Sequence, residues 1–288
     1  MQFLIFGHGY TASELTPRLS ARGWTVTGTT RTDPDRVAKS GAAALLWPGD
    51  HAAVSRAIAA ADAILISVAP APDGAADPVI AEFHAELLAA RPRWIGYLSS
   101  TNVYGDHGGA WVDETTPATP DMPRAQARLQ AEREWSNLSA RAGWPLSIFR
   151  LAGIYGPGRG PFEKLRRGTA RRIVKPGQVF SRIHVEDIAG AILASLDMPA
   201  PRGETQILNV CDDQPAPPQD VIAAAANMLC IPVPRAEDFD AAQMSPMARS
   251  FYADSKRVRN ARMKTDLGYQ LRYPDYHSGL AAILDTEG

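Results

Sequence analysis

The stretch Gly7-His-Gly-Tyr-Thr-Ala12 decides the fold of this 288-residue chain. It follows the short apolar run from Phe3 to Phe6 and precedes a helix-like segment from Thr11 to Arg22. A G-x-G-x-x-A turn is informative in this context, between a strand and a helix. The first glycine permits a tight turn, the second clears space for a pyrophosphate, and the alanine lets the helix pack close to the sheet. Amides at a helix start also attract anions. The stretch therefore predicts a dinucleotide site made by Gly7, Gly9, Tyr10, Thr11 and Ala12.

Apolar runs and helix-like segments alternate beyond this turn. We expect strands at Trp24 to Thr29, Ala63 to Val68, Trp94 to Ser99 and Leu146 to Arg150, and helices at Ile80 to Ala90 and Ala125 to Ala140. Buried strands separated by crossover helices imply a parallel sheet that is covered on both faces. The predicted fold class is therefore α/β, a Rossmann-type doubly wound parallel sheet.

The pattern becomes less regular after Gly156-Pro-Gly-Arg-Gly160. Proline clusters occur at Pro215-Ala-Pro-Pro218 and Ile231-Pro-Val-Pro234, around an alanine-rich helix candidate from Val221 to Met228. We predict a Rossmann domain over residues 1–155 and a smaller C-terminal substrate lobe mainly over residues 156–288. Residues from about 180 to 212 are expected to return to the first domain.

Composition points to a small-molecule partner. Thirty basic and 31 acidic residues, without a long run of either sign, give no electrostatic reason to expect nucleic acid or an anionic membrane. No apolar window is long enough to span a bilayer, and the opening residues lack a signal-peptide pattern. Cys211 and Cys230 form no metal-binding or disulfide pattern, so we expect no metal and a reduced cytoplasmic setting.

The end of the second strand favours NADP over NAD. It reads Thr27-Gly-Thr-Thr-Arg31, where an NAD-specific site would carry an acidic residue for the ribose 2′-hydroxyl. A guanidinium offers forked charged donors to a 2′-phosphate. We therefore expect Thr30 and Arg31 at this phosphate, with a solvated Arg31 as the alternative.

Several segments together resemble the extended short-chain dehydrogenase/reductase family, which contains nucleotide-sugar epimerases and dehydratases. Its marks are the Gly7 to Ala12 turn and four later segments. These are Tyr97-Leu-Ser-Ser-Thr-Asn-Val-Tyr-Gly105, Phe149-Arg-Leu-Ala-Gly-Ile-Tyr-Gly-Pro157, Arg182-Ile-His-Val-Glu-Asp187 and Leu208-Asn-Val-Cys-Asp-Asp213. The resemblance implies that Ser100 orients the substrate, and Ala69 completes the expected cofactor contacts.

The family's Tyr-x-x-x-Lys pair is missing, which places the chain in an atypical, epimerase-like branch. Arg124 aligns with the tyrosine and Arg128 with the lysine. We expect Arg128 at the cofactor ribose and Arg124 at the substrate, although a guanidinium cannot act as a base. The alternative is that both are solvated, with Arg128 paired to Glu132. A Tyr-x-x-x-Lys string does occur at Tyr252-Ala-Asp-Ser-Lys256, but we interpret it as coincidental because it lies late in the chain.

A reaction without this pair needs another proton source. The candidates are Tyr104, Tyr155 and His107, of which Tyr104 is our predicted catalytic residue beside Ser100; turn packing is the alternative for both tyrosines. Arg182 and Tyr155 are predicted substrate contacts.

Other positions bear on the substrate. Arg159 is a further candidate anion contact, and His184 is expected to brace the lobe interface. Phe180 occupies a position where nucleotide-sugar enzymes often carry an arginine, which disfavours such substrates. Glu186 and Asp187 open a predicted helix, and we expect them to cap it and to complement its dipole.

Three functions remain open. The first is an NADP-dependent oxidoreductase or epimerase-like enzyme that acts on a small carbonyl or sugar-like compound. The second is a non-catalytic NADP(H)-binding sensor, and the third is a nucleotide-sugar epimerase or dehydratase. Either a monomer or a homodimer fits the resemblance.

Overall fold

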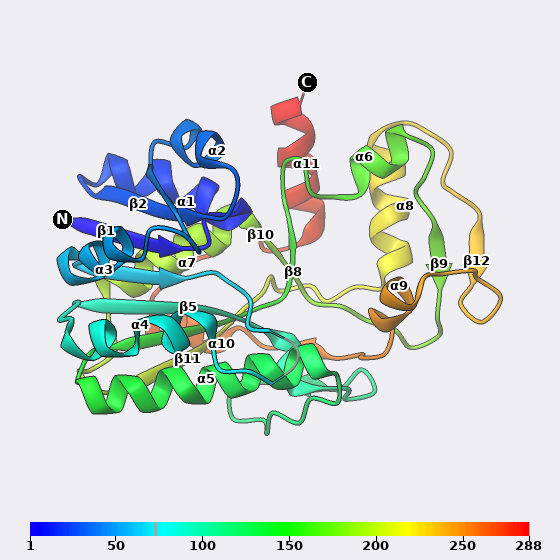
Figure 1. The fold of residues 1–288 in the computed structure, drawn as a ribbon. Coiled ribbons are helices and arrows are strands. Elements are labelled where there is room, and N and C mark those ends of the chain that lie inside the picture. The colour runs from blue at the N-terminus through cyan, green and yellow to red at the C-terminus, as the bar shows by residue number, and fades with distance from the viewer. Residues whose placement is uncertain (72–73, 288) are drawn as a thin grey trace.

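The computed structural model describes residues 1–71 and 74–287, and a seven-stranded parallel sheet forms its larger part (Figure 1). The strands are β1 (Gln2–Phe6), β2 (Thr25–Thr30), β3 (Ala43–Leu46), β4 (Ala63–Ile66), β5 (Trp94–Ser100), β7 (Leu146–Leu151) and β11 (Thr205–Val210). Their order is β11-β7-β5-β4-β1-β2-β3. The chain therefore runs outward from β1 in one direction and outward from β4 in the other. This confirms the Rossmann-type fold and places the switch point, beside which such sheets bind ligands, between β1 and β4.

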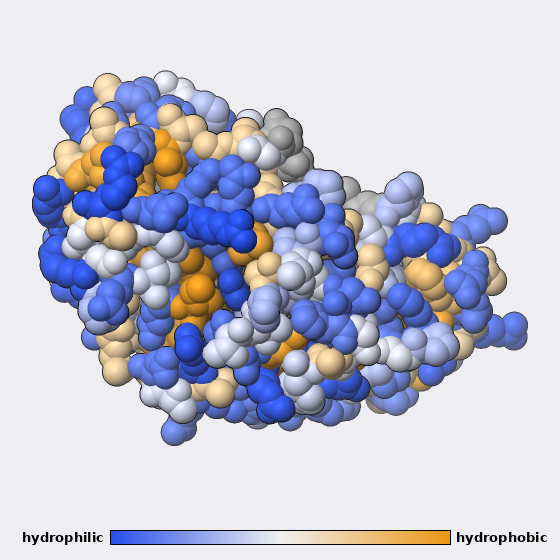
Figure 2. Space-filling view, turned by 90° about the horizontal axis from the view of Figure 1, so that it is seen from below, coloured by the Kyte–Doolittle hydropathy of each residue, from blue (hydrophilic) through white to orange (hydrophobic). Residues whose placement is uncertain are grey.

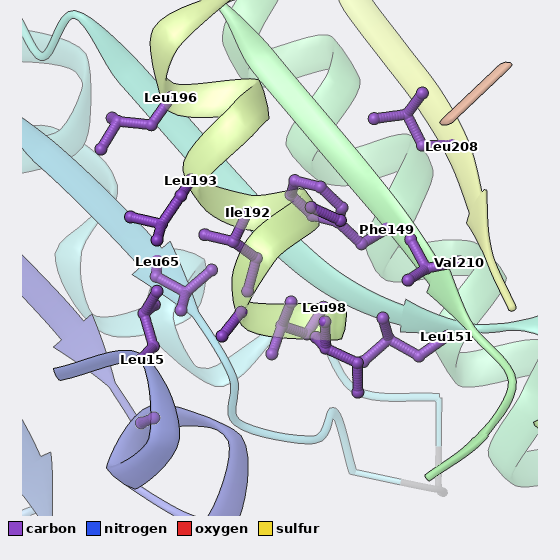
Figure 3. Packing of buried hydrophobic residues seen from close by; sticks show 14 of the residues in the cluster. Leu15, Leu65, Leu98, Phe149, Leu151, Ile192, Leu193, Leu196, Leu208 and Val210 are labelled. Carbon is purple, nitrogen blue, oxygen red and sulfur yellow. The ribbon is translucent and has the colours of Figure 1, made fainter. Parts of the chain in front are cut away.

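Helices cover both faces of the sheet. The main helices are α1 (Tyr10–Ala21), α2 (Pro34–Lys39), α3 (His51–Ala60), α4 (Pro78–Ala89), α5 (Pro123–Ala142) and α7 (Val185–Asp197). The apolar sides of α1 and α7 pack on one face, where Leu15, Leu193 and Phe149 belong to one buried cluster (Figure 3). The sides of α3, α4 and α5 pack on the other face in a second cluster. Each such buried side chain contributes roughly 1.5–3 kcal/mol through removal of apolar surface from water.

Most of the remaining elements build a smaller lobe, which extends from the centre to the right of Figure 1. They are β8 (Gly153–Tyr155), α6 (Pro161–Arg166), β9 (Arg172–Val174), β10 (Arg182–His184), α8 (Pro218–Met228), β12 (Ala236–Asp238), α9 (Pro246–Ser250) and α11 (Tyr276–Glu287). A third apolar cluster joins α6, α8 and α11 through Phe162, Ala225 and Leu280.

Two connections tie the later chain to the first part. The short strands β6 (Trp111–Val112) and β13 (Arg257–Val258) pair in parallel, and α10 (Ala261–Asp266) then packs near β11.

The face that carries α5 shows mostly hydrophilic side chains with apolar residues between them (Figure 2).

Candidate functional site

A cavity of about 1220 Å³ lies at the carboxyl ends of the central strands. Gly7 after β1, Ser67 after β4, Ser100 at the end of β5 and Ala152 after β7 line one side, and residues of the lobe line the other. The volume exceeds the roughly 300–1,000 Å³ of a pocket for one drug-sized ligand. The cavity therefore has room for an extended cofactor together with a second molecule.

The turn from Gly7 to Ala12, called the phosphate cradle below, has the backbone shape that the sequence predicts. Gly7 has φ +80°, and a Cβ there would lie 2.7 Å from Val68 Cγ1, so only glycine fits. Gly9 is the N-cap of α1 and offers no side-chain cap. The amides of Tyr10, Thr11 and Ala12 find no acceptor within residues 1–71 and 74–287. Unsatisfied amides at a bare helix start fit the pyrophosphate of a dinucleotide.

The residues after β2 leave a guanidinium exposed at the edge of the cradle. Arg31 is exposed, and no described carboxylate lies within ion-pair distance of it. Thr30 is buried, and its Oγ1 accepts a hydrogen bond from the Asp33 amide (3.2 Å). The Asp33 carboxylate caps α2 and pairs with Arg36, so its oxygens already have partners. Ala69 follows β4 and is exposed, outside the cavity lining.

A buried network fixes the end of β5. Glu132 of α5 accepts a hydrogen bond from Ser99 Oγ (2.5 Å) and pairs with Arg150 of β7 (2.8 Å). Ser100 follows directly; it lines the cavity, and its Oγ accepts from the Asn102 amide (3.2 Å) at the start of the 3₁₀ helix η1 (Thr101–Tyr104). The Ser100 hydroxyl is therefore held at the cavity wall with its own proton free to donate.

Arg124 and Arg128 both reach the cavity. Arg128 donates to the Leu98 carbonyl (2.8 Å) and the Tyr97 hydroxyl (3.3 Å), which anchors it beside the Ser100 turn. The alternative pairing with Glu132 does not occur, because that carboxylate is taken by Arg150. Arg124 lies over the Phe251 ring, with its guanidinium carbon 5.1 Å from the ring centroid.

Of the three candidate proton donors, Tyr155 lines the cavity, whereas Tyr104 and His107 do not. Tyr155 lines the cavity and donates to the Asp275 carbonyl (3.4 Å), and burial raises the pKa of its phenol. Tyr104 is fully buried outside the cavity lining, where it donates to Asn209 Oδ1 (2.8 Å). His107 bonds to the Tyr104 carbonyl and is also absent from the lining. A phenol without access to the cavity cannot exchange a proton with a substrate there, so Tyr104 is a packing residue in this arrangement.

The cavity wall is strongly cationic. Its basic residues are Arg124, Arg128, Arg159, Lys164, Arg171, Arg182 and Lys256, and Asp254 is its one carboxylate among the described residues. Arg182 donates to the carbonyls of Phe180 and Ala216 rather than to a carboxylate. Arg171 is neutralised by Glu237 (2.5 Å). The other charges attract an anion to this space.

His184 does not face the cavity. Its ring lies between Tyr155 and Tyr273, at centroid distances of 5.2 and 4.2 Å, and its Nδ1 accepts from the Glu186 amide as the cap of α7. Glu186 and Asp187 both lie in the first turn of α7, as expected for acids that complement the helix dipole, but the side chain that caps the helix is that of His184. Asp187 instead accepts hydrogen bonds from the amides of Arg272 and Tyr273.

The interpretation of Tyr252 and Lys256 as remote from the site is wrong. Both line the cavity that holds Ser100. The Lys256 ammonium donates to the Gly105 carbonyl (2.6 Å), at the end of the turn that Ser100 begins. The two residues belong to an irregular segment, so their spacing of four is not what brings them together. The β6–β13 pairing does so across about 150 residues, which no local pattern could indicate.

Within the described ranges, no group of three His, Cys, Asp or Glu side chains could hold a metal ion. No helix in the described chain has the length and apolar character needed to cross a bilayer.

Comparisons with known proteins agree with this architecture. A family model described as the NAD dependent epimerase/dehydratase family matches residues 3–211. Protein YeeZ of Escherichia coli (strain K12) is 32% identical over 283 residues, which cover 94% of this chain and 96% of that protein. A 3-diazoavenalumate denitrifying reductase of a Streptomyces species is 28% identical over 184 residues, 59% of this chain and 58% of the reductase.

A solved structure from Silicibacter pomeroyi DSS, of a conserved protein of unknown function, is similar over almost the whole chain. It matches with a TM-score of 0.92 at 52% identity and covers 99% of this chain and 98% of its own. The resemblance inferred from the motifs is thus confirmed. The chain belongs to the NAD dependent epimerase/dehydratase family.

Proposed function

We propose that the protein is an NADP(H)-dependent oxidoreductase or epimerase-like enzyme that acts on a small, anionic carbonyl or sugar-like compound. The observation that carries this proposal is one cavity that runs from the bare start of α1 to Ser100 and on to the lobe. A bound nicotinamide supplies hydride exchange with a carbonyl or alcohol carbon. Ser100 would hold the substrate oxygen, and Arg128 would face the cofactor ribose.

The preference for NADP rests on the end of β2. Arg31 is exposed there and has no described carboxylate partner, and the nearby Asp33 carboxylate is used by Arg36 and the start of α2. A free guanidinium suits a 2′-phosphate, whereas a ribose 2′-hydroxyl is usually held by a free acid.

The substrate class rests on charge. Arg124, Arg182 and Lys164 line the lobe side of the cavity without a carboxylate within ion-pair distance in the described chain. Buried or partly buried cations that lack an anion are satisfied by a charged ligand. The reductase name of the Streptomyces relative further supports a redox reaction.

Calorimetric titration with NADPH and NADH tests the cofactor assignment. Replacement Arg31→Ala is expected to weaken NADPH binding about tenfold or more and to leave NADH binding unchanged, because it removes one charged contact to phosphate. Arg22→Ala is the matched control, since Arg22 is an exposed arginine paired with Asp197 at the far end of α1. Equal affinities for both cofactors, unchanged by Arg31→Ala, would exclude the NADP preference, and absence of binding would exclude the cradle.

A second candidate is a sensor that binds NADP(H) without turnover. The guanidinium of Arg124, in place of the family's tyrosine, favours it, since Arg124 lines the cavity but cannot act as a base. A screen of carbonyl and sugar compounds for NADPH oxidation separates the two. Turnover that Ser100→Ala abolishes supports an enzyme, whereas tight binding without turnover supports a sensor. Retention of a UDP or dTDP sugar would instead support the nucleotide-sugar alternative.

A further inference from the structure

The segment around Lys256 is fixed firmly against the loop that follows the Ser100 turn. The Ser255 carbonyl accepts hydrogen bonds from the amides of His107 (3.1 Å) and Gly109 (2.8 Å). The Ser255 amide donates to Asp106 Oδ1 (2.7 Å), and the next residues pair with β6. Two segments about 150 residues apart therefore form one rigid wall of the cavity.

Lys256 is buried in this wall, with 6% of its surface exposed. Its ammonium donates to the Gly105 carbonyl (2.6 Å) and to Asp254 Oδ2 (3.2 Å). An ammonium has three N–H donors. The third has no acceptor in the described parts of the chain, while the side chain lines the cavity. The remaining N–H donor is therefore available to an oxygen atom of a molecule bound in the cavity.

The position of this ammonium relative to Ser100 is defined by one short turn. Ser100 Oγ accepts from the Asn102 amide at the start of η1, and Lys256 Nζ binds the carbonyl of Gly105, directly after η1. The two polar groups thus belong to opposite ends of the same rigid turn. Both side chains also line the same cavity, so one bound molecule can contact both.

We infer that Lys256 is the group that exchanges a proton with the substrate oxygen, in place of the missing tyrosine. The inference rests on the proposed function. In reduction of a carbonyl, the nicotinamide of the proposed function would supply the hydride that forms the new C–H bond. The N–H bond at Lys256 Nζ breaks, the O–H bond of the product alcohol forms, and the neutral amine regains a proton from solvent. In the oxidising direction the neutral amine accepts the hydroxyl proton, and the oxidised nicotinamide would take the hydride.

The other groups of the wall are less suited to this role. Arg124 and Arg128 stay protonated at any accessible pH. Burial raises the pKa of the Tyr155 and Tyr252 phenols, which makes both poor proton donors and leaves little phenolate to act as a base. Burial lowers the pKa of Lys256, against the opposing charges of Asp254 on its own segment and Asp106 on the facing loop. A proton donor works best when its pKa lies near the operating pH.

Reductive labelling of the intact protein tests this without a known substrate. The probe is glyoxylate, a small aldehyde that carries a carboxylate, with cyanoborohydride to reduce the imine formed with a neutral amine. Peptide mapping by mass spectrometry then gives the labelling rate of each lysine against pH. We expect Lys256 to reach half its maximal labelling rate at a lower pH than the exposed Lys39, because burial lowers the pKa of Lys256. We also expect saturating NADPH to leave Lys39 unaffected while it changes the rate at Lys256.

Labelling of Lys256 that is no faster than that of Lys39 at neutral pH, or that follows the same pH curve, overturns the inference. Calorimetry with NADPH on the same preparation reports separately on the proposed function. Lys256→Met is expected to keep NADPH affinity and to lose about 10²–10⁴-fold in kcat with any carbonyl substrate that the screen finds. Lys256→Arg, which keeps the charge but cannot release the proton, should lose turnover to a similar degree and keep the KM closer to the original value. Full turnover in either variant contradicts the assignment.

Discussion

Glu132 is the residue on which the position of the Ser100 turn depends. It connects α5, β5 and β7 through its bonds to Ser99 and Arg150, and its carboxylate is almost fully buried. Glu132→Gln would leave the Arg150 guanidinium buried without an opposite charge. We expect the free energy of unfolding to fall by about 3–5 kcal/mol, as measured by urea denaturation.

Two comparisons control this experiment. Glu237→Gln removes an exposed ion pair with Arg171 and should change stability far less, because water screens that pair. The double replacement Glu132→Gln with Arg150→Met removes both charges and should recover part of the loss. Equal effects of the two single replacements would show that the buried network contributes little.

The start of α7 gives a prediction at the scale of an element. His184 Nδ1 accepts the Glu186 amide, so the neutral ring carries its proton on Nε2 and protonation must break the cap. Burial lowers the pKa of His184 to about 4. In the unfolded chain this histidine binds a proton as the pH falls through about 6.5, whereas in the folded chain it stays neutral until about pH 4. The contribution of the neutral ring to the free energy of unfolding is therefore complete above pH 6.5 and is lost as the pH falls toward 4. We expect a loss of about 2 kcal/mol between pH 7 and pH 5 in urea unfolding.

His184→Asn is the matched variant, since asparagine also caps helices and does not titrate. The variant should be less stable at pH 7 but show a smaller decrease between pH 7 and pH 5. If both proteins lose the same stability over this interval, the acid sensitivity comes from other groups.

At the scale of the whole molecule, Asp187 holds the C-terminal segment against the sheet domain. Its two oxygens accept from the amides of Arg272 and Tyr273 and from the Tyr269 hydroxyl. Asp187→Ala leaves two amides without acceptors, which costs about 2–5 kcal/mol. We expect hydrogen exchange by mass spectrometry to show faster exchange over residues 269–287 than over β1 to β5.

Asp197→Ala is the control on the same helix, because Asp197 forms an exposed pair with Arg22. It should leave exchange in the C-terminal segment unchanged. If hydrogen exchange in Asp187→Ala becomes faster to the same degree throughout the molecule, the C-terminal segment does not open on its own.

The fold could be predicted because its central strands are short, buried and apolar. The expected runs at Trp94 to Ser99 and Leu146 to Arg150 each end one residue short of β5 and β7. The edge strand β3 was not expected, because Ala43–Leu46 is brief and partly exposed and shows no clear period. The helix expected from Ile80 begins at Pro78, because Asp77 caps it there. The spacing of apolar residues alone does not indicate this earlier start.

The site could be predicted only where its residues are local in sequence. The cradle from Gly7 to Ala12 and the Ser100 turn are each continuous segments with known geometry. The position of Tyr104 close to Ser100 in sequence suggests a proton donor at the cavity. Its hydroxyl instead binds Asn209 on β11, a contact that the local sequence does not indicate. Lys256 seemed remote because the hydrogen bonds that bring it to Gly105 join segments about 150 residues apart. Pairing at this separation leaves no periodic signal in the chain.

The strand order has a consequence for synthesis on the ribosome. Strand β11 pairs with β7, but β8, α6, β9, β10 and α7 are made between them. At a translation rate of about 5–20 residues per second, Val210 follows Leu151 by roughly 3–12 seconds. Throughout that interval β7 is an edge with unpaired backbone groups, and the α7 side of the apolar core is uncovered for much of it. Until β11 has been made, the nascent chain is therefore most exposed to strand pairing with another chain through β7 and most in need of chaperone protection.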